Sequence, residues 1–266
     1  MQHLLTLAIK AAIEAGDEII KVYNGENALD VLLQKENDTP LTAADRLAHV
    51  SISKNLAYAS YPVLSEEGRD IPYEERSLWE HFWMVDPLDG TKEFLKRNGQ
   101  FTVNIALIKR NQPVLGVIYQ PTEDHLYFAA EGIGAYKCTG AQTKWGGRLS
   151  SLIEVSEKLP IDKKREAYVV VASRSHLSDE TRDFIELLKK EHANVETASI
   201  GSSLKICLVA EGSADIYPRF APTMEWDTAA GDAIARCAGK QIANSENGEP
   251  IKYNKPNLLN GWFIVR

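Results

Sequence analysis

Three apolar runs in residues 101–128 constrain the fold more than any other part of this sequence. Residues 102–108, 114–119 and 126–128 are rich in β-branched, aliphatic and aromatic side chains, and a polar turn at residues 111–113 separates the first two. Short apolar runs bounded by turn residues are typical of β-strands, and tight turns join antiparallel neighbours. The stretch therefore predicts an antiparallel meander.

The residues before this meander predict two helices and two strands. In residues 3–22, apolar side chains recur every three or four positions, as in one stripe of an amphipathic helix: Leu4, Leu7, Ala8, Ala11, Ala15, Ile19 and Val22. A second helix is predicted from Thr42 to Ala59, because Thr42 and Asp45 have the spacing of a capping box. Its apolar positions would be Leu47, Val50, Ile52 and Leu56. Residues 62–65 and 82–85 are short apolar runs that end in acids, which predicts buried strands.

The second half of the sequence alternates between strand and helix patterns. Strands are predicted at 168–171, near 195, at 214–217 and at 261–265, with helices at 178–191, 202–211 and 227–238. Such alternation favours a mixed or parallel sheet covered by helices. A glycine-rich stretch at 132–147 and a connector at 149–165 place a boundary near residue 150. We therefore expect a layered α/β (α+β) sandwich with an α+β half, residues 1–150, and an α/β half, residues 151–266.

Composition narrows the functional classes. Of 266 residues, 44% are apolar and 25% charged, which excludes collagen, coiled-coil and low-complexity chains. The net charge of −7 argues against a nucleic-acid partner. Charged residues interrupt the N-terminal apolar stripe, so no signal or membrane-spanning segment is expected there. Three widely spaced cysteines indicate no disulfide framework. A cytoplasmic protein without an obligate protein partner is expected, and peripheral association with the cytoplasmic side of the inner membrane stays open.

The most informative segment for chemistry is residues 85–94. Pro87 disfavours a helical conformation at Asp86, which predicts that this carboxylate is held at the end of a strand. Asp86 and Asp89 can then converge across the turn, with the carbonyl of Leu88 between them as a third oxygen ligand. Oxygen ligands of this kind suit Mg²⁺ and not zinc.

Further groups near these acids predict a phosphate site. The amides of Gly90 and Thr91 would open a helix N-terminus, where free N–H groups favour an anion. Glu66 also follows an apolar run, and Asp227 stands at a predicted helix start. Each acid alone also fits a solvated turn or a helix cap. Three chain segments that each present an acid favour a metal site.

These motifs resemble a known superfamily. Asp-Pro-Leu-Asp-Gly-Thr at 86–91, Ser-Glu-Glu at 65–67 and Trp-Asp-Thr-Ala-Ala-Gly at 226–231 resemble the lithium-sensitive, Mg²⁺-dependent inositol monophosphatases and fructose 1,6-bisphosphatases. Lys-Glu-Phe at 92–94, Ser-Arg-Ser-His at 173–176, Ile-Gly-Ser-Ser-Leu-Lys at 200–205 and Tyr-Pro-Arg-Phe at 217–220 resemble the bacterial 3′(2′),5′-bisphosphate nucleotidases of sulfate assimilation. The resemblance spans nearly the whole chain and implies a layered αβαβα sandwich.

The resemblance also implies a metal site with two or three Mg²⁺ ions. One ion would be held by Glu66, Asp86 and the Leu88 carbonyl, and a second by Asp86, Asp89 and Asp227. Thr91, hydrogen-bonded toward Glu66, would orient the attacking water. The acid for a third ion or for the proton is assigned to Asp38, which stands four residues before Thr42.

Substrate-binding roles follow from the same resemblance. His176 and Ser202 would contact the nucleoside, and Lys205 and Arg219 would pair with the second phosphate. The remaining members of the implied set are Asp89, Gly90, Thr91, Gly201 and Asp227. From the residues alone, Lys205 also fits a solvated helix position and His176 a turn.

The leading functional prediction is hydrolysis of the 3′-phosphate of adenosine 3′,5′-bisphosphate, with Mg²⁺ and a small nucleotide as the only ligands. An inositol or sugar monophosphatase of the same superfamily is the first alternative. A catalytically idle nucleotide-binding regulatory module is an alternative of another class. Sensitivity to lithium is a further expectation from the resemblance.

Overall fold

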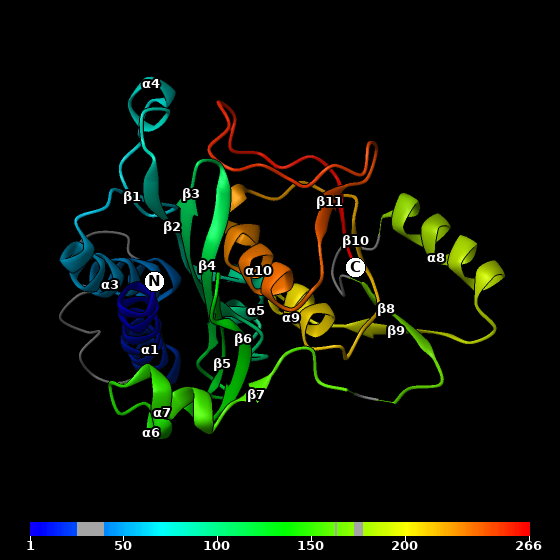
Figure 1. The fold of residues 1–266 in the computed structure, drawn as a ribbon, viewed down its shortest axis with the longest axis horizontal. Coiled ribbons are helices and arrows are strands. Elements are labelled where there is room, and N and C mark those ends of the chain that lie inside the picture. Colours follow the sequence, from blue (N-terminus) through cyan, green and yellow to red (C-terminus); the bar gives the residue numbers. More distant parts are fainter. Residues whose placement is uncertain (26–39, 163, 173–177) are drawn as a thin grey trace.

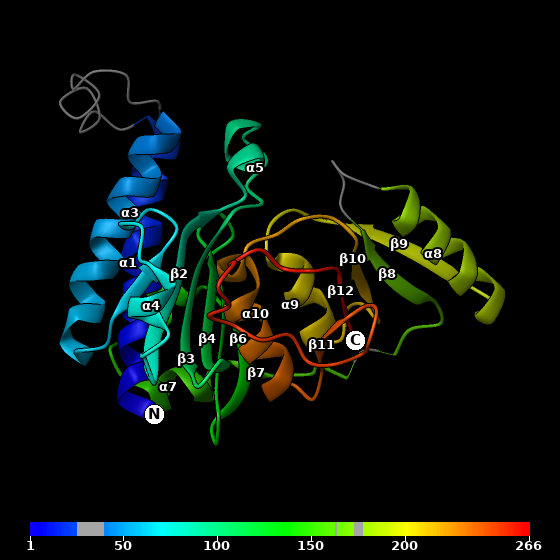
Figure 2. The same ribbon diagram turned by 90° about the horizontal axis from the view of Figure 1, so that it is seen from above.

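The structure, a computed structural model, describes residues 1–25, 40–162, 164–172 and 178–266. Its elements are layered in the order helices, sheet, helices, sheet, helix (Figure 1). The view from above shows the same order, with α1 and α3 on one outer side and α8 on the other (Figure 2). The predicted αβαβα sandwich is therefore confirmed.

The larger sheet has seven strands in sequence order. The first two strands are parallel and all later neighbours are antiparallel, so the predicted meander is confirmed. The glycine-rich stretch, for which no strand was predicted, contains β6. The strands are β1 (Val63–Ser65), β2 (His81–Asp89), β3 (Thr102–Lys109), β4 (Gln112–Gln120), β5 (His125–Ala130), β6 (Gly134–Thr139) and β7 (Glu157–Lys158).

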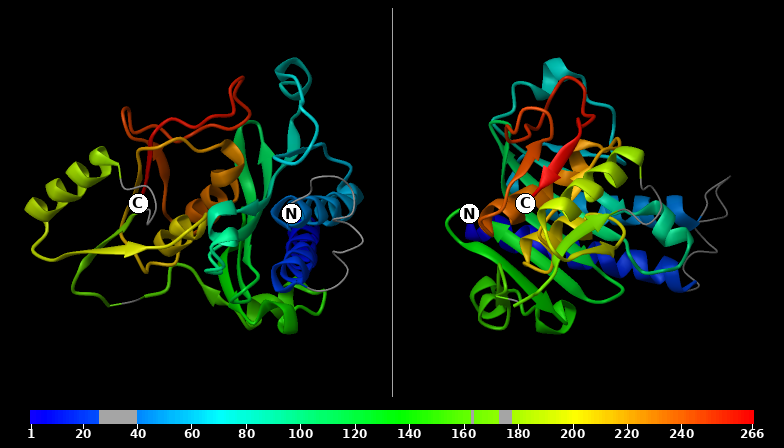
Figure 3. Two further views of the ribbon diagram at one scale, coloured as in Figure 1. Left: turned by 180° about the vertical axis from the view of Figure 1, so that it is seen from behind. Right: turned by 90° about the vertical axis from the view of Figure 1, so that its right-hand side faces the viewer.

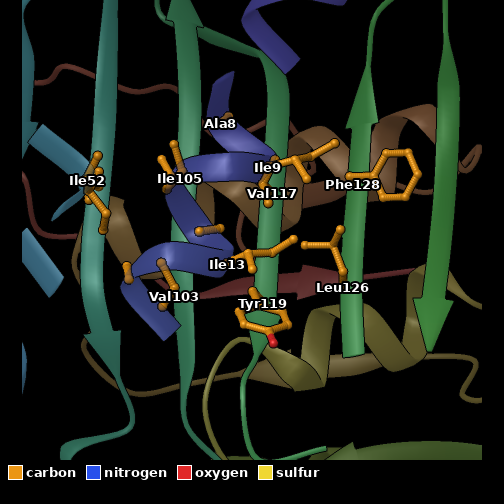
Figure 4. Packing of buried hydrophobic residues seen from close by; sticks show 14 of the residues in the cluster. Ala8, Ile9, Ile13, Ile52, Val103, Ile105, Val117, Tyr119, Leu126 and Phe128 are labelled. Carbon is orange, nitrogen blue, oxygen red and sulfur yellow. The ribbon is translucent and has the colours of Figure 1, made fainter. Parts of the chain in front are cut away.

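Two long helices cover the outer face of this sheet: α1 (Gln2–Asn24) and α3 (Pro40–Leu56). In Figure 4, Ile9 and Ile13 of α1 lie against the apolar side chains of β3, β4 and β5, and Ile52 of α3 lies over β2. Burial of this apolar stripe stabilises both helices, because isolated helices are marginal in water.

The start of α3 corrects one prediction. The helix begins at Pro40, so Thr42 lies inside it and is not the N-cap of a capping box. Proline suits a first helical position, because its missing N–H would have no partner there. Val50 was predicted on the buried face but is 58% exposed.

Short helices complete the first half and its boundary. They are α4 (Tyr73–Arg76), α5 (Thr91–Leu95), α6 (Ala141–Lys144), α7 (Leu149–Glu154) and the 3₁₀ turn η1 (Ala57–Ala59).

The second half builds the remaining layers. Helices α9 (Leu204–Ala210) and α10 (Glu225–Cys237) pack between the two sheets, and α8 (Asp179–Glu191) lies on the outer side (Figure 3). The smaller layer pairs β8 (Tyr168–Ala172) with β9 (Val195–Ser199) in parallel, and places β12 (Phe263–Val265) between β10 (Tyr217–Arg219) and β11 (Ile242–Asn244). A parallel bridge between Val170 and Ile216 joins the two parts. This mixed arrangement agrees with the sequence pattern, although β10 starts later than predicted and β11 was not predicted.

Gly116 lets α10 pack directly on β4. A Cβ atom at this position would lie 2.2 Å from the Ala230 carbonyl oxygen of α10. Only glycine permits such close backbone approach without displacing the helix.

The division of the chain near residue 150 stays a prediction. Two elements that follow this residue pack with the first half: β7 belongs to the larger sheet, and α10 covers one face of it.

Across the described residues, no helix combines the length and the apolar character needed to cross a lipid bilayer.

Candidate active site

Strand β2 carries Asp86 and Asp89 on either side of an irregularity. Its pairing with β3 shifts register between these residues, at Pro87 and Leu88. A proline has no N–H for a strand ladder, so a bulge is where a strand accommodates it. Asp86 therefore lies inside β2, 1% exposed, and not at the strand end as predicted.

Two aspartates are each oriented by a main-chain N–H close in sequence. The N–H of Leu88 donates to Asp86 Oδ1 at 3.1 Å. The N–H of Met224 donates to Asp227 Oδ2 at 2.9 Å, which fixes this carboxylate in the first turn of α10. In each case the second oxygen accepts no main-chain or hydroxyl donor from the described residues.

Asp89 is oriented from the second half of the chain. Its Oδ2 accepts hydrogen bonds from Ser202 Oγ and from the N–H of Ser203, both at 2.6 Å. Thr102 and Asn104 on β3 extend this network through the serine hydroxyls. Only Oδ2 of Asp89 is used by the described hydrogen bonds, so Oδ1 stays available as a ligand.

Five carboxylates are electrostatic neighbours, and we call them the acid cluster: Asp45, Glu66, Asp86, Asp89 and Asp227. Burial raises the pKa of Asp86 well above its usual range, and its acidic neighbours raise it further. Burial and the charge of Asp89 raise the pKa of Asp227 to about 7. Burial also raises the pKa of Glu66, which lies within hydrogen-bonding reach of Asp86. These carboxylates repel one another, and a cation would relieve that repulsion.

The donor set fits Mg²⁺, although no coordination shell is preformed. Among the described residues, no three His, Cys, Asp or Glu side chains already converge on one point as metal ligands do. The carboxylates nevertheless supply only hard oxygen donors, and three of them keep one oxygen available. Hydrogen bonds to the other oxygen hold the carboxylates in place, as outer-shell partners do in metal sites.

Thr91 lies beside these acids but does not make the expected contact. It is exposed at the start of α5, and within the described chain no hydrogen bond joins it to Glu66. Helix α5 has five residues, so an anion here would depend on the amides of Gly90 and Thr91 and little on a helix dipole.

A cavity of about 150 Å³ opens next to Asp89 and Asp227. It brings together predicted residues from both halves of the chain: Asp89, Gly90, Gly201, Ser202, Lys205, Arg219 and Asp227. It is also lined by residues that were given no role from sequence, including Lys92, Glu93 and Tyr217.

Lys205 is the buried cation of this cavity. It is 9% exposed, so the alternative of a solvated helix residue is wrong. Its Nζ donates to the carbonyl of Ser202 at 2.6 Å and approaches that of Ile200 at 3.5 Å. Burial lowers the pKa of Lys205 to about 8, while Asp89 favours the charged form.

Arg219 supplies the second cation. One terminal nitrogen donates to the Pro222 carbonyl at 3.1 Å. Its buried Nε has no hydrogen-bond partner among the described residues. A buried donor without a partner is costly, so an anionic ligand in this cavity would satisfy it.

Gly201 allows the loop before α9 to close over α5. A Cβ atom here would lie 2.6 Å from Glu93 Cγ and 2.9 Å from the Gln100 carbonyl oxygen. The next residue, Ser202, has φ 58°, a left-handed conformation that residues other than glycine rarely adopt. The loop therefore has a constrained shape that places Ser202 beside Asp89.

Comparison with known proteins identifies the family of this chain. The model of the inositol monophosphatase family matches residues 1–261. The chain belongs to the inositol monophosphatase family. This is a family of Mg²⁺-dependent phosphatases.

Within the family, individual relatives are similar over their full length. A 3′(2′),5′-bisphosphate nucleotidase CysQ of Shigella flexneri is 45% identical over 266 residues, which is 98% of this chain and 99% of the relative. The crystal structure of CysQ from Bacteroides thetaiotaomicron has a TM-score of 0.94 and 53% identity, and covers 100% of this chain and 97% of its own. The extragenic suppressor protein suhB of Bartonella henselae has a TM-score of 0.69 and 28% identity, over 99% of this chain and 93% of its own.

Two residues to which the family resemblance gave a role cannot be placed. Asp38 and His176 lie outside the described residues.

Asp45 joins the acid cluster of this family member, although the sequence reading gave it only a capping role. Burial and the charges of Glu67 and Glu66 raise its pKa to about 8. Its spacing from Thr42 gave no sign of this role, which depends on the packing of α3 beside Glu66 and Glu67. A buried acid whose pKa is raised by other acids is a candidate for a functional role.

Proposed function

We propose that this chain is a Mg²⁺-dependent 3′(2′),5′-bisphosphate nucleotidase that converts adenosine 3′,5′-bisphosphate to AMP and phosphate. One observation carries the proposal: Asp89 and Asp227 of the acid cluster line the same cavity as Lys205 and Arg219. A substrate with two phosphates can place one at the acids, with Mg²⁺, and the other at the two cations. The full-length relatives named as bisphosphate nucleotidases support the same substrate class, and with it a role in sulfur assimilation or nucleotide recycling.

The metal-holding residues are proposed as two sets that share Asp86. Glu66, Asp86 and the Leu88 carbonyl would hold one Mg²⁺, and Asp86, Asp89 and Asp227 a second. The raised pKa values of Asp86 and Asp227 support these sets, because they result from burial and from neighbouring acids, and a bound cation would offset both effects. When bound, Mg²⁺ lowers the pKa of water and offsets negative charge on the leaving oxygen.

Asp45 is proposed to take up the proton that the attacking water loses. Burial and the charges of Glu67 and Glu66 raise the pKa of Asp45 to about 8, so its carboxylate would hold an incoming proton more strongly than an ordinary aspartate does. Mg²⁺ bound at the acid cluster would keep Asp45 ionised before it accepts that proton. Thr91 is proposed to orient this water through its hydroxyl. Asp38, to which the sequence gave the proton or a third ion, remains the alternative to Asp45.

The cavity cations are proposed to select the bisphosphate. Arg219 offers a planar guanidinium, which matches phosphate oxygens well, and Lys205 adds a buried charge. The amides of Gly90 and Thr91 would hold the phosphate that is removed. Contacts of His176 and Ser202 with the nucleoside stay proposals. A cytoplasmic location is also proposed, which suits the three free thiols Cys138, Cys207 and Cys237.

The test is phosphate release by the purified protein. We expect release from adenosine 3′,5′-bisphosphate with Mg²⁺, none with a chelator, and inhibition by lithium. Preferred turnover of inositol 1-phosphate would replace the proposal with an inositol monophosphatase. A folded protein that binds the nucleotide but releases no phosphate at saturating Mg²⁺ would instead be a binding module.

A further inference from the structure

A segment outside the cavity ties two parts of the acid cluster together. Residues 252–260, which we call the C-terminal strap, run between β11 and β12 across the start of α10 toward α4 (Figure 1). The strap is anchored to the β3–β4 turn, where Tyr253 and Asn111 exchange hydrogen bonds of 3.1 and 2.6 Å.

Asn254 of the strap bridges a buried cation and a buried anion. Its Oδ1 accepts from Arg76 at 2.7 Å, and its Nδ2 donates to the Arg76 carbonyl at 2.7 Å. Its main-chain N–H donates to the carboxylate of Glu225 at 2.5 Å. All three residues are at least 95% buried. Hydrogen bonds to charged groups in such surroundings are strong and directional.

The two ends of this bridge belong to segments that carry proposed metal ligands. Arg76 ends α4, in the segment that follows Glu66. Glu225 stands in the first turn of α10, together with Asp227. The bridge therefore fixes the segment of Glu66 against the helix start that presents Asp227.

Further strap contacts hold the same helix start. The Asn260 N–H donates to the Thr223 carbonyl and its Nδ2 to the Met224 carbonyl, both at 2.8 Å. Lys255 donates to the Glu225 carboxylate from both its N–H and its Nζ. The turn that delivers the Met224 N–H to Asp227 is thus held from outside the cavity.

We propose that Arg76, Asn254 and Glu225 are positioning residues for the Mg²⁺ site. They would set the spacing between Glu66 and Asp227, which come from distant parts of the chain and share no direct hydrogen bond among those described. The inference rests on the metal site of the proposed function and not on the identity of the substrate. Outer-shell partners of metal ligands typically change metal affinity roughly 10- to 100-fold when they are removed.

The test compares the Mg²⁺ affinity of two variants, each of which loses one network of hydrogen bonds. The network of Asn254 is buried, and that of Arg165 is half-buried. Asn254→Gly removes the bridging amide, and glycine adopts the positive φ of 64° at this position without strain. Arg165→Gln is the matched control, because it breaks the two-hydrogen-bond pair with Asp215, which lies outside the cavity. Mg²⁺ binding is measured by calorimetry, and by the Mg²⁺-induced rise in Tm, without nucleotide.

We expect Asn254→Gly to weaken Mg²⁺ binding by roughly tenfold or more. Arg165→Gln should lower the Tm yet keep the Mg²⁺ dissociation constant within about twofold of the parent, because its partners are remote from the metal ligands. Should Asn254→Gly not fold, Arg76→Lys keeps the charge but loses the planar fork, and it should weaken Mg²⁺ binding in the same direction.

Two results would overturn the inference: unchanged Mg²⁺ affinity in a folded Asn254→Gly, or an equal loss in the Arg165→Gln control. Because nucleotide is absent, these results are independent of substrate identity. A parent protein that binds Mg²⁺ but does not hydrolyse the bisphosphate would contradict the proposed function alone.

Discussion

The acid cluster and the two cavity cations, which we call the acid wall and the cation wall of the site, are built differently. On the acid wall, Asp86 and Asp227 are fixed by main-chain N–H groups of residues two or three positions away, within β2 and at the start of α10. On the cation wall, Lys205 is held by a loop of constrained shape, and Arg219 stands at the end of β10. Asp86 and Asp227 thus depend on local backbone geometry, whereas Asp89 and the loop that holds Lys205 depend on how the two halves pack together. We infer that the acid wall provides the chemistry and the cation wall the substrate preference.

Removing one charge from the acid wall should have the largest effect. Asp86→Asn keeps the side-chain volume but removes a carboxylate that both proposed ions share. We expect kcat to fall by more than about 100-fold, because the loss of an outer-shell partner alone lowers metal affinity or activity by up to about 100-fold. The metal-free Tm should rise, because a buried charge with acidic neighbours is removed. Steady-state kinetics and thermal unfolding with a chelator measure the two effects.

Asp232→Asn is the control for this prediction. Asp232 is also a fully buried aspartate, but it pairs with Arg236 on α10 and has no member of the acid cluster among its electrostatic neighbours. It should lose stability and keep its kcat. If Asp86→Asn kept kcat within tenfold of the parent, Asp86 would not be a shared ligand.

Replacing the buried cation should change substrate preference instead. Lys205→Met should raise the KM for adenosine 3′,5′-bisphosphate by roughly tenfold or more, because hydrogen bonds between charged groups contribute about 1.5–3 kcal/mol. The KM for a nucleoside monophosphate should rise less, since only the loop contacts of Lys205 are lost. The exposed Lys189, paired with Glu186 on α8, gives the control Lys189→Met. An equal increase in KM for the bisphosphate and the monophosphate would contradict the proposed role of Lys205.

The smallest expected effect is a pH dependence of the cation wall. The folded pKa of Lys205 is about 8, below its ordinary 10.5, so the bisphosphate KM should rise as pH passes above 8, by at most about tenfold per unit. Between about 8 and 10.5 the unfolded chain holds this proton and the folded chain does not. The free energy of unfolding contributed by Lys205 should therefore increase with pH in that window.

In Lys205→Met, neither the KM for the bisphosphate nor the free energy of unfolding should change with pH in this way. The two quantities are measured over a pH series, by steady-state kinetics and by denaturant unfolding, for the variant and the parent. A KM series that keeps its slope in Lys205→Met would assign the titration to another group.

Sequence reasoning predicted the features of the fold and of the site that depend on residues close together in the sequence. The meander and α1 follow from hydrophobic periodicity, the layer order was implied by the family resemblance, and the acids of residues 85–94 belong to a motif with defined spacing. It was wrong at positions whose conformation or burial depends on packing between strands and helices. Asp86 is inside β2 because a bulge carries Pro87, and Val50 is exposed although it fits the apolar stripe.

Contacts between distant segments were beyond the sequence patterns. Asp45 fits a capping box by spacing, and only its burial beside Glu66 and Glu67 shows it as part of the acid cluster. Ser202 was expected at the nucleoside, yet its hydroxyl donates to Asp89 from the other half of the chain. No local pattern encodes such pairings.

The close contact of Gly116 with Ala230 has a consequence for motion in this molecule. Where two backbones touch without side chains between them, the elements cannot slide past each other, so β4 and α10 move as one block. Asp227 stands on α10 itself, and Asp86 stands on β2 of the same sheet as β4. We therefore expect a change in the width of the cavity to come from the outer sheet, which carries Arg219 on β10.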